Sequence, residues 1–371
     1  MKGKRSIVFV FALMSMTGFA QIDKLPDGFT VLDQCESTVI KSQDRTGTCW
    51  SFSTSSFLES EIIRTYGTHI DLSEMFTVRN IYMEKAMKYV RYQGMANFSQ
   101  GSLAHDVLYS YQKYGMMPES AYSGKNGKKK HDHSAMAKEL KSFLDSMIKT
   151  HHIDPHWKQS FTNILDKHMG PVNPIFDYEG KSYNPMSFAK EVLKLDMNAY
   201  IGFTSFTHHN FYEPMVVEVP DNFSDGVYTN LPLDELMKVL DEAIAEGFSV
   251  EWDGDVSEVG FARRKGYAVF NNDTNAIKNL PDLPSEGEVS QELRQALFDS
   301  YETTDDHLMH ITGKTQTEDG RVFYVVKNSW GKKAGIEGHV LMSDAYMRMK
   351  TVSLYVHKSA VPRSILDKLE D

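Results

Sequence analysis

The sequence predicts an α+β fold with two lobes that meet at a cleft. Segments with apolar residues at helical spacing dominate the first part of the chain, whereas short β-rich segments separated by Gly and Asp dominate the part after residue 248. Helices gathered first and strands last favour two packed lobes. With 371 residues, 41% hydrophobic and 24% charged, the chain is long enough for one elaborated domain or two such lobes.

Residues 1–20 have the composition of a secretory signal peptide. Lys2, Lys4 and Arg5 precede an apolar run over 7–14, and a small-residue cleavage site ends at Ala20. The run is too short to span a bilayer, and no later stretch approaches about eighteen apolar residues, so no membrane anchor is expected. We therefore expect an exported, soluble mature chain, either periplasmic or extracellular.

The charge balance disfavours a nucleic-acid-binding role. The formal net charge is −10, and loss of the basic leader would make it more negative. Phosphate binding draws on a basic surface. The basic cluster at 125–130 is interrupted by Gly127 and is interpreted as a solvated loop.

The predicted elements follow in chain order. After an extended lead-in from residue 21, residues 21–122 form a helical lobe, 123–230 a largely helical insertion and 231–371 a β-rich lobe. Caps and apolar spacing predict helices over 49–64, 103–114, 134–147 and 232–247. Strands are predicted over 248–252, 308–312, 322–327, 339–342 and 352–356.

Two cysteines, Cys35 and Cys49, are interpreted as unpaired. Cys49 follows a turn-prone segment and begins a predicted helix, whose N-terminus favours a thiolate. A thiolate is the nucleophile that attacks a carbonyl. The resulting oxyanion needs donors, which the backbone N–H of Cys49 and the side-chain amide of Gln43 are placed to supply. Cys35 is interpreted as a small buried hydrophobe.

A catalytic thiolate needs an imidazole partner, and two histidines compete for that role. His307 and His310 differ by three positions on a predicted strand and so face opposite sides. Downstream, Asn328 offers an amide to orient an imidazole, and Trp330 an indole to shield that hydrogen bond from water.

These residues together resemble the papain-like cysteine peptidases. The resemblance consists of Gln43 six residues before Cys49-Trp50, Asp306-His307 followed six residues later by Gly313, and Asn328-Ser329-Trp330-Gly331. In that family the four catalytic roles belong to Gln, Cys, His and Asn. The spacing to Gly313 assigns the catalytic role to His307, and the resemblance implies a papain-like fold with a β-barrel-like second lobe.

Within this superfamily, the chain is most similar to the bleomycin hydrolase and aminopeptidase C group. The similarity includes Gly101-Ser102, which by resemblance lie in the cleft and bind substrate backbone, and the His307-x-Met309-x-x-Thr312-Gly313 pattern. The group's members are intracellular hexamers whose C-terminal arm lies in the cleft. This chain is expected to be exported, to stop at Asp371 before such an arm reaches the cleft, and to need no propeptide removal.

The sequence thus predicts a cysteine peptidase acting on peptides, an aminopeptidase first and an endopeptidase second, without a cofactor. A catalytically silent papain-like binding protein is the alternative class, against which the four intact catalytic residues argue. Several histidines invite a metal interpretation, namely His131, His133, His151, His152, His156, His208 and His209. No acidic or cysteine partner repeats at ligand spacing, so no metal site is predicted.

Overall fold

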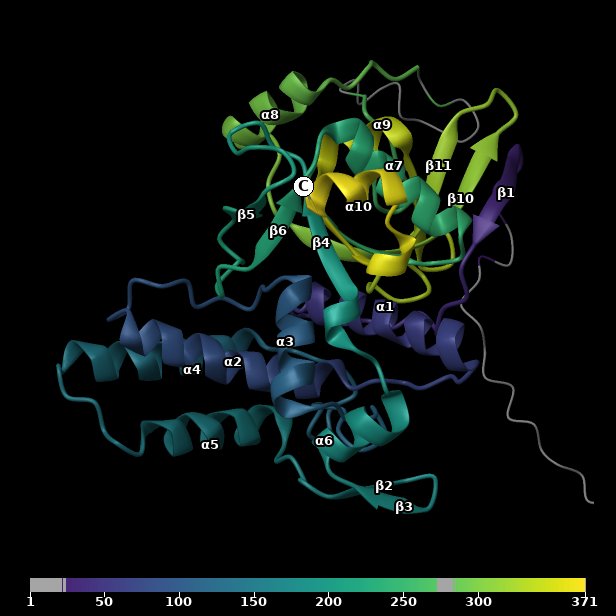
Figure 1. Cartoon of the computed structure of the whole chain (residues 1–371). Helices are drawn as coiled ribbons and strands as arrows, with labels where there is room; N and C mark the ends of the chain where they lie inside the picture. Colours follow the sequence, from purple (N-terminus) through teal and green to yellow (C-terminus); the bar gives the residue numbers. More distant parts are fainter. Residues whose placement is uncertain (1–21, 23–24, 272–282, 284, 371) are drawn as a thin grey trace, which may run out of the picture.

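The structure, a computed structural model, describes residues 22, 25–271, 283 and 285–370. A helical lobe and a lobe built on one large sheet lie side by side, with helix α1 (Cys49–Tyr66) at their boundary (Figure 1). The predicted signal peptide, residues 1–20, lies outside the described residues. Of the described helices, none has the length and apolarity needed to cross a membrane.

Helix α1 is the central element of the helical lobe. It is buried from Cys49 to Ile63, because helices pack on one side of it and strands of the sheet on the other. It ends at Gly67, whose φ of 63° is the left-handed conformation that commonly closes a helix. Helices α2 (Glu74–Arg91) and α3 (Ala104–Tyr114) pack against it, and α4 (Ser134–Lys149) and α5 (Trp157–Met169) pack against α2.

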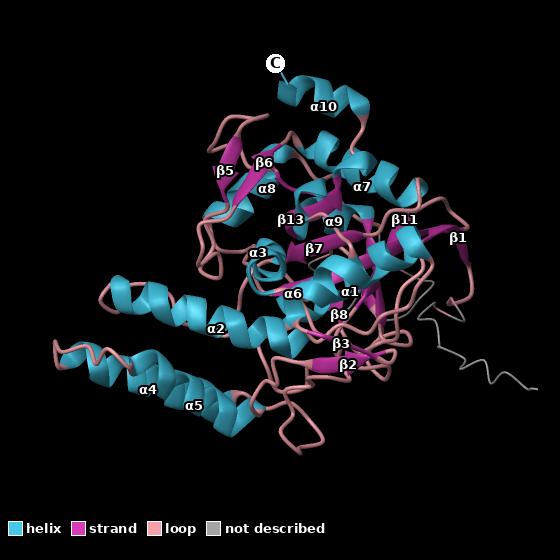
Figure 2. Cartoon of the chain, turned by 60° about the horizontal axis from the view of Figure 1, so that its bottom comes forward, coloured by secondary structure: helices cyan, strands magenta, loops and turns pink. Residues whose placement is uncertain are grey.

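Helices α4 and α5 pack together and project from the body of the lobe beside α2 (Figure 2). Each buries a stripe of apolar side chains, from Met136 to Met147 in α4 and from Trp157 to Met169 in α5. The helix predicted over 134–147 is therefore confirmed. A small hairpin, β2 (Phe176–Tyr178) with β3 (Lys181–Tyr183), and the short helix α6 (Pro185–Phe188) complete this lobe.

The second lobe is built on the large sheet, whose strands follow the order β5-β6-β4-β13-β7-β10-β11-β12-β9-β8, with β1 paired to β10. Its bounds are β1 (Phe29–Gln34), β4 (Tyr200–Thr204), β5 (Pro214–Val216), β6 (Val227–Asn230), β7 (Val250–Gly254), β8 (Phe261–Ala262), β9 (Tyr267–Ala268), β10 (His307–Thr317), β11 (Val322–Lys327), β12 (His339–Ser343) and β13 (Thr351–His357). The predicted strands correspond to β7 and β10–β13.

The expected barrel-like closure is not observed, because the described strands form an open sheet. Its two ends are the short strands β5 and β8, which do not pair with each other. Strand β10 has two partners along one edge: β7 pairs with its first half and β1 with its second half. A register shift between Ile311 and Gly313 separates the two halves and bends the strand.

The segment 123–230 differs from the expected, largely helical insertion. Only its first part is helical, and β4, β5 and β6 belong to the main sheet. Strand β4 pairs antiparallel with β13 and buries Phe203 completely. Phe203 therefore packs in the core of the β-rich lobe, which begins before residue 231, whereas Tyr200 and Tyr228 pack in the core of the helical lobe.

Helices α7 (Leu233–Ala245) and α9 (Asp344–Lys350) pack against the sheet, and α8 (Gln291–Asp299) packs beside α9. The last described helix, α10 (Arg363–Glu370), lies against α7 in the β-rich lobe, as Figure 1 shows beside the C-terminus. Lys368 of α10 forms an ion pair with Glu235 of α7, and Ile365 is buried in the lobe's core. The described C-terminal residues therefore pack against α7 in the β-rich lobe.

Candidate active site

Cys49 is the first residue of α1, as the sequence predicts. Thr48, which precedes it, makes no side-chain capping bond, and the first turn of the helix carries no acidic residue. The partial positive charge of the helix N-terminus is therefore not neutralised locally. The preceding loop is fixed by Gln100, whose side-chain oxygen accepts a hydrogen bond from Gly47 N at 2.9 Å.

Burial nevertheless disfavours the thiolate form of Cys49. Burial raises its pKa to about 12, and this outweighs the backbone N–H groups of Leu308 and Trp50, which point at the sulfur and lower the pKa. Burial thus opposes the helix N-terminus, which favours the thiolate. Leu308 directly follows His307, so its contact with the sulfur brings the start of β10 to Cys49.

His307 is held by Asn328, as predicted. The His307 Nε2 atom lies 2.9 Å from Asn328 Oδ1, which also accepts a hydrogen bond from Ser329 N at 2.7 Å. Because Oδ1 is an acceptor, Nε2 must carry a hydrogen, and Nδ1 is left as the basic nitrogen. Burial lowers the pKa of His307 to about 4, so the ring is neutral at physiological pH and able to accept the thiol proton.

Trp330 covers the imidazole. Its ring stacks on His307 with centroids 4.6 Å apart and an interplanar angle of 23°. The guanidinium of Arg263 lies over the same indole, 4.0 Å from its centroid, and this positive charge also lowers the pKa of His307. The predicted supporting residue is thus in contact with the predicted base.

Gln43 is tied to the same constellation. Its Oε1 accepts a hydrogen bond from Ser329 Oγ at 2.6 Å, and its Nε2 donates to the carbonyl of Thr46 at 2.7 Å. The amide nitrogen carries two hydrogens, so one remains for an oxyanion beside Cys49. Gln43 therefore connects the loop before the nucleophile to the segment that carries Asn328.

Gly101 and Ser102, the predicted substrate-binding residues, have different surroundings. Trp50 Nε1 donates to the carbonyl of Gln100 at 2.9 Å, which anchors this segment beside Cys49. A Cβ added at Gly101 would lie 1.6 Å from a carboxylate oxygen of Asp221, so no side chain fits there. Ser102 is buried, and its hydroxyl donates to Asp106 at 2.7 Å, so its side chain serves the start of α3.

Comparison with known proteins agrees with this geometry. Residues 177–371 match the family described as "Peptidase C1-like family", and residues 25–196 match "Papain family cysteine protease". The chain belongs to the peptidase C1-like family. Because the family is one of cysteine peptidases, Cys49, His307, Asn328 and Gln43 are the residues whose types and order correspond to its chemistry.

Two curated relatives of this C1-like peptidase carry aminopeptidase names. Aminopeptidase C of Lactococcus lactis subsp. lactis is 21% identical over 377 residues, covering 90% of this chain and 83% of the relative. Aminopeptidase W of Lactobacillus delbrueckii subsp. lactis is 27% identical over 196 residues, covering 52% of this chain but only 43% of the relative.

A solved structure shares the fold. The crystal structure of PepW from Lactobacillus rhamnosis HN001 superposes with a TM-score of 0.70 at 18% identity, covering 92% of this chain and 84% of that chain. The papain-like fold predicted from the sequence is therefore confirmed.

The remaining cysteine and histidine interpretations also have clear outcomes in this C1-like peptidase. Cys35 and Cys49 are both free and buried, as predicted. His310 lies within hydrogen-bonding distance of Ser56 in α1 (Nδ1 to Oγ, 2.9 Å) and shares no hydrogen-bond partner with His307. The glycine spacing thus selected the histidine that contacts Asn328.

The sequence did not indicate two acidic residues near the nucleophile, Asp305 and Asp221. Burial is the largest cause of the raised pKa of the Cys49 thiol, and the charges of Asp305 and Asp221 raise it further. The backbone N–H of Leu308 lowers it. Asp305 stands two residues before His307, a position that could have suggested it. Asp221 is distant from every catalytic residue in the chain, so only the fold brings it here.

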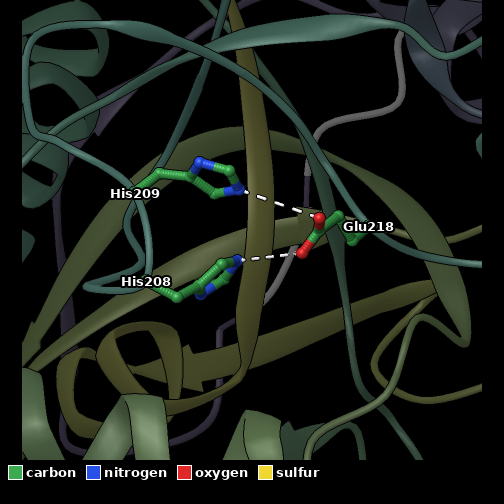
Figure 3. Close-up of side chains that lie close together, drawn as sticks. All are labelled: His208, His209 and Glu218. Atoms are coloured by element: carbon green, nitrogen blue, oxygen red, sulfur yellow. Dashed lines mark ion pairs between the residues drawn. The ribbon is translucent and has the colours of Figure 1, made fainter.

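Among the described residues, one group has the arrangement of metal ligands: His208, His209 and Glu218 (Figure 3). Glu218 lies 3.2 Å from His208 Nε2 and 3.8 Å from His209 Nε2. Gln295 Oε1 accepts from Thr207 N, so its Nε2 must donate to His208 Nδ1. A neutral His208 then carries its hydrogen on Nε2, facing Glu218, where a metal would need a lone pair. These contacts favour a hydrogen-bonded pair over a metal site.

Proposed function

We propose that this protein is an aminopeptidase that releases amino-terminal residues from peptides through a thioester intermediate. The proposal rests on the hydrogen bond between His307 Nε2 and Asn328 Oδ1. His307 begins β10, and the backbone N–H of the next residue, Leu308, contacts the Cys49 sulfur. The names of its relatives, aminopeptidase C and aminopeptidase W, support the choice of exopeptidase.

The chemistry proceeds in two balanced steps. Cys49 Sγ attacks the substrate carbonyl carbon while His307 Nδ1 takes the thiol proton, and the oxyanion is stabilised by Gln43 Nε2 and the Cys49 N–H. His307 then gives the proton to the leaving amine, and a thioester remains. Water attacks the thioester with His307 as base, the carboxylic acid leaves, and the thiol is restored.

Burial explains why this pair suits the reaction. Each charged form is disfavoured alone, since burial raises the thiol pKa to about 12 and lowers the imidazole pKa to about 4. Transfer of the proton between them creates two opposite charges that stabilise each other in a low-dielectric site. Asn328 keeps Nε2 protonated throughout, so Nδ1 alone shuttles the proton.

The test compares free-amine and N-acetylated forms of one fluorogenic aminoacyl-coumarylamide series. We expect hydrolysis of the free-amine form at a higher kcat/KM, with no hydrolysis by Cys49→Ala. Equal turnover of both forms would assign the protein as an endopeptidase instead. If Cys49 reacts with iodoacetamide no faster than a free thiol at neutral pH and neither substrate is cleaved, the chain is a silent binding protein.

We also propose export of the enzyme, on the basis of the basic and apolar composition of residues 1–20. Amino-terminal sequencing of the secreted chain should begin at Gln21, and retention of Met1 would contradict this. A homo-oligomer, by resemblance a hexamer, stays a prediction that the molar mass in solution tests.

A further inference from the structure

A hollow of about 390 Å³ opens beside the acidic residues near Cys49. Its walls are contributed by the segments 218–220 and 298–305. They combine apolar and aromatic side chains with the carboxylates of Glu218, Asp299 and Asp305 and the hydroxyls of Thr303 and Thr304. Val219, Pro220, Phe298 and Tyr301 supply the apolar surface, and Asp305 lines it as well. A concave site with an apolar wall and several acidic groups suits a small ligand that has an apolar part and a positive charge.

Asp221 follows the Pro220 wall and lies over Gly101. Its carboxylate occupies the space where a side chain at Gly101 would stand. Two side chains hold the carboxylate: Ser99 Oγ donates to Asp221 Oδ1 at 2.9 Å, and Asn97 Nδ2 lies 3.4 Å from the same oxygen. Asp221 therefore fixes a negative charge at the segment beside the nucleophile.

Asp305 is the second carboxylate of this group. Its Oδ2 atom is sealed from solvent and receives no hydrogen bond from a described N–H or hydroxyl donor. Asp253, fully buried behind it, shares a hydrogen bond with Asp305 that requires a proton on one of the two carboxyls. Burial and then the charge of Asp221 raise the pKa of Asp305 to about 7.

The two carboxylates thus repel each other, and a cation between them would relieve that repulsion. The charge of Lys85 offsets part of this repulsion, because it lowers the pKa of Asp305. Its Nζ, however, donates to the carbonyl oxygens of Ser99 and Gly101 and not to either carboxylate. The carboxylates are also not grouped as metal ligands, since the described residues offer that grouping only at His208, His209 and Glu218. An ammonium group, which binds spaced oxygens through three hydrogens, fits better than a chelated ion.

We propose that Asp221 and Asp305 bind the α-ammonium group of the substrate, with the first side chain in the hollow lined by Phe298 and Tyr301. This inference rests on the proposed function and deepens it, because it assigns the preference for a free amine to two side chains of the lobes themselves. The substrate class is a peptide with a free, protonated amino terminus and an apolar first residue.

The experiment measures kcat/KM for leucyl-coumarylamide and its N-acetylated form with wild type, Asp221→Asn and Asp305→Asn. We expect each variant to lose about 10- to 100-fold for the free amine and little for the acetylated form, because one charged hydrogen bond is lost. The matched control is Asp225→Asn, which removes an exposed carboxylate of the same loop that pairs with Lys88. Its selectivity ratio should equal that of wild type.

The outcomes separate the two proposals. If wild type prefers the free amine and both variants keep that preference, the assignment of Asp221 and Asp305 is overturned while the aminopeptidase remains. If wild type cleaves both substrates equally, the aminopeptidase assignment fails and this inference with it. Since Asp305→Asn could disturb folding, thermal unfolding is recorded for every variant, and Asp221→Asn, which changes a half-buried residue, decides the result.

Discussion

The start and the middle of strand β10 carry two imidazoles with the same chemistry and different surroundings. His307 contacts Asn328, stacks on Trp330 and precedes the amide that meets Cys49. His310 is completely buried and contacts Ser56, whose hydroxyl also accepts a hydrogen bond from Lys327 at 2.7 Å. Burial lowers the pKa of both rings, and Lys327 lowers that of His310 further.

The difference teaches that burial alone does not make a catalytic base. Burial lowers the pKa of both histidines. Only His307 has one ring nitrogen oriented by an amide while the next residue, Leu308, contacts a thiol. His310 belongs to a polar network behind α1, in which Lys327 donates to Thr38, Thr38 to Glu59, and Lys41 to Glu59. One end of the strand supports chemistry, and the middle supports the docking of α1.

Replacing each histidine by alanine tests this comparison most directly. For His307→Ala we expect kcat/KM to fall on the order of 10⁴-fold, because the thiol loses its base, with thermal stability near that of wild type. For His310→Ala we expect activity within about tenfold of wild type and a free energy of unfolding lower by about 1–3 kcal/mol, because Ser56 loses a buried partner. Equal activity losses in both variants would contradict the division of roles.

The network behind α1 should be most sensitive at Glu59. Glu59 is 1% exposed and accepts hydrogen bonds from Lys41, Thr38 and the backbone of Leu72. Glu59→Ala leaves Thr38 and the Leu72 amide without their acceptor and removes one of the carboxylates that pair with Lys41. We therefore expect the free energy of unfolding to fall by about 3–5 kcal/mol in urea titrations. The control Glu242→Ala removes an exposed pair with Lys238 and should cost at most about 1 kcal/mol. Similar losses in both would show that burial of the pair is unimportant.

Asn328→Ala sharpens the view of the catalytic end. Without Oδ1, the His307 ring loses the acceptor that keeps the hydrogen on Nε2, so we expect kcat to fall by about 10²-fold while the fold persists. Steady-state kinetics with the free-amine substrate measure this. A loss below about threefold would mean that Trp330 stacking alone orients the ring.

The smallest effect is expected from Arg263, whose charge lowers the pKa of His307 after the larger effect of burial. Arg263→Gln removes that charge, so the pKa of His307 should rise and the acid limb of kcat/KM should move to higher pH, by about half a unit to one unit for a solvent-exposed charge. Arg264→Gln, which removes an equal charge at the next position, is the control. A shift toward lower pH, or equal shifts in both variants, would contradict the assignment.

The sequence was most informative where a residue's role is set by its neighbours in the chain. Caps, periodicity and motif spacing are local signals. They predicted the helix that begins at Cys49, the strand that carries His307 and the segment Asn328-Ser329-Trp330-Gly331. The segment 123–230 was mispredicted in part, because the place of β4 in the main sheet depends on its pairing with β13, far along the chain.

The sequence by itself predicted the fold class and the four candidate catalytic residues in their order, because these depend on residue types and short spacings. Only the tertiary structure decided that burial raises the pKa of the Cys49 thiol, that Gln43 is held by Ser329 and Thr46, and that the described sheet is open. It alone also brought Asp221 to Gly101. Such properties arise from the electric field and the packing of groups that are distant in the chain, and no local pattern encodes either.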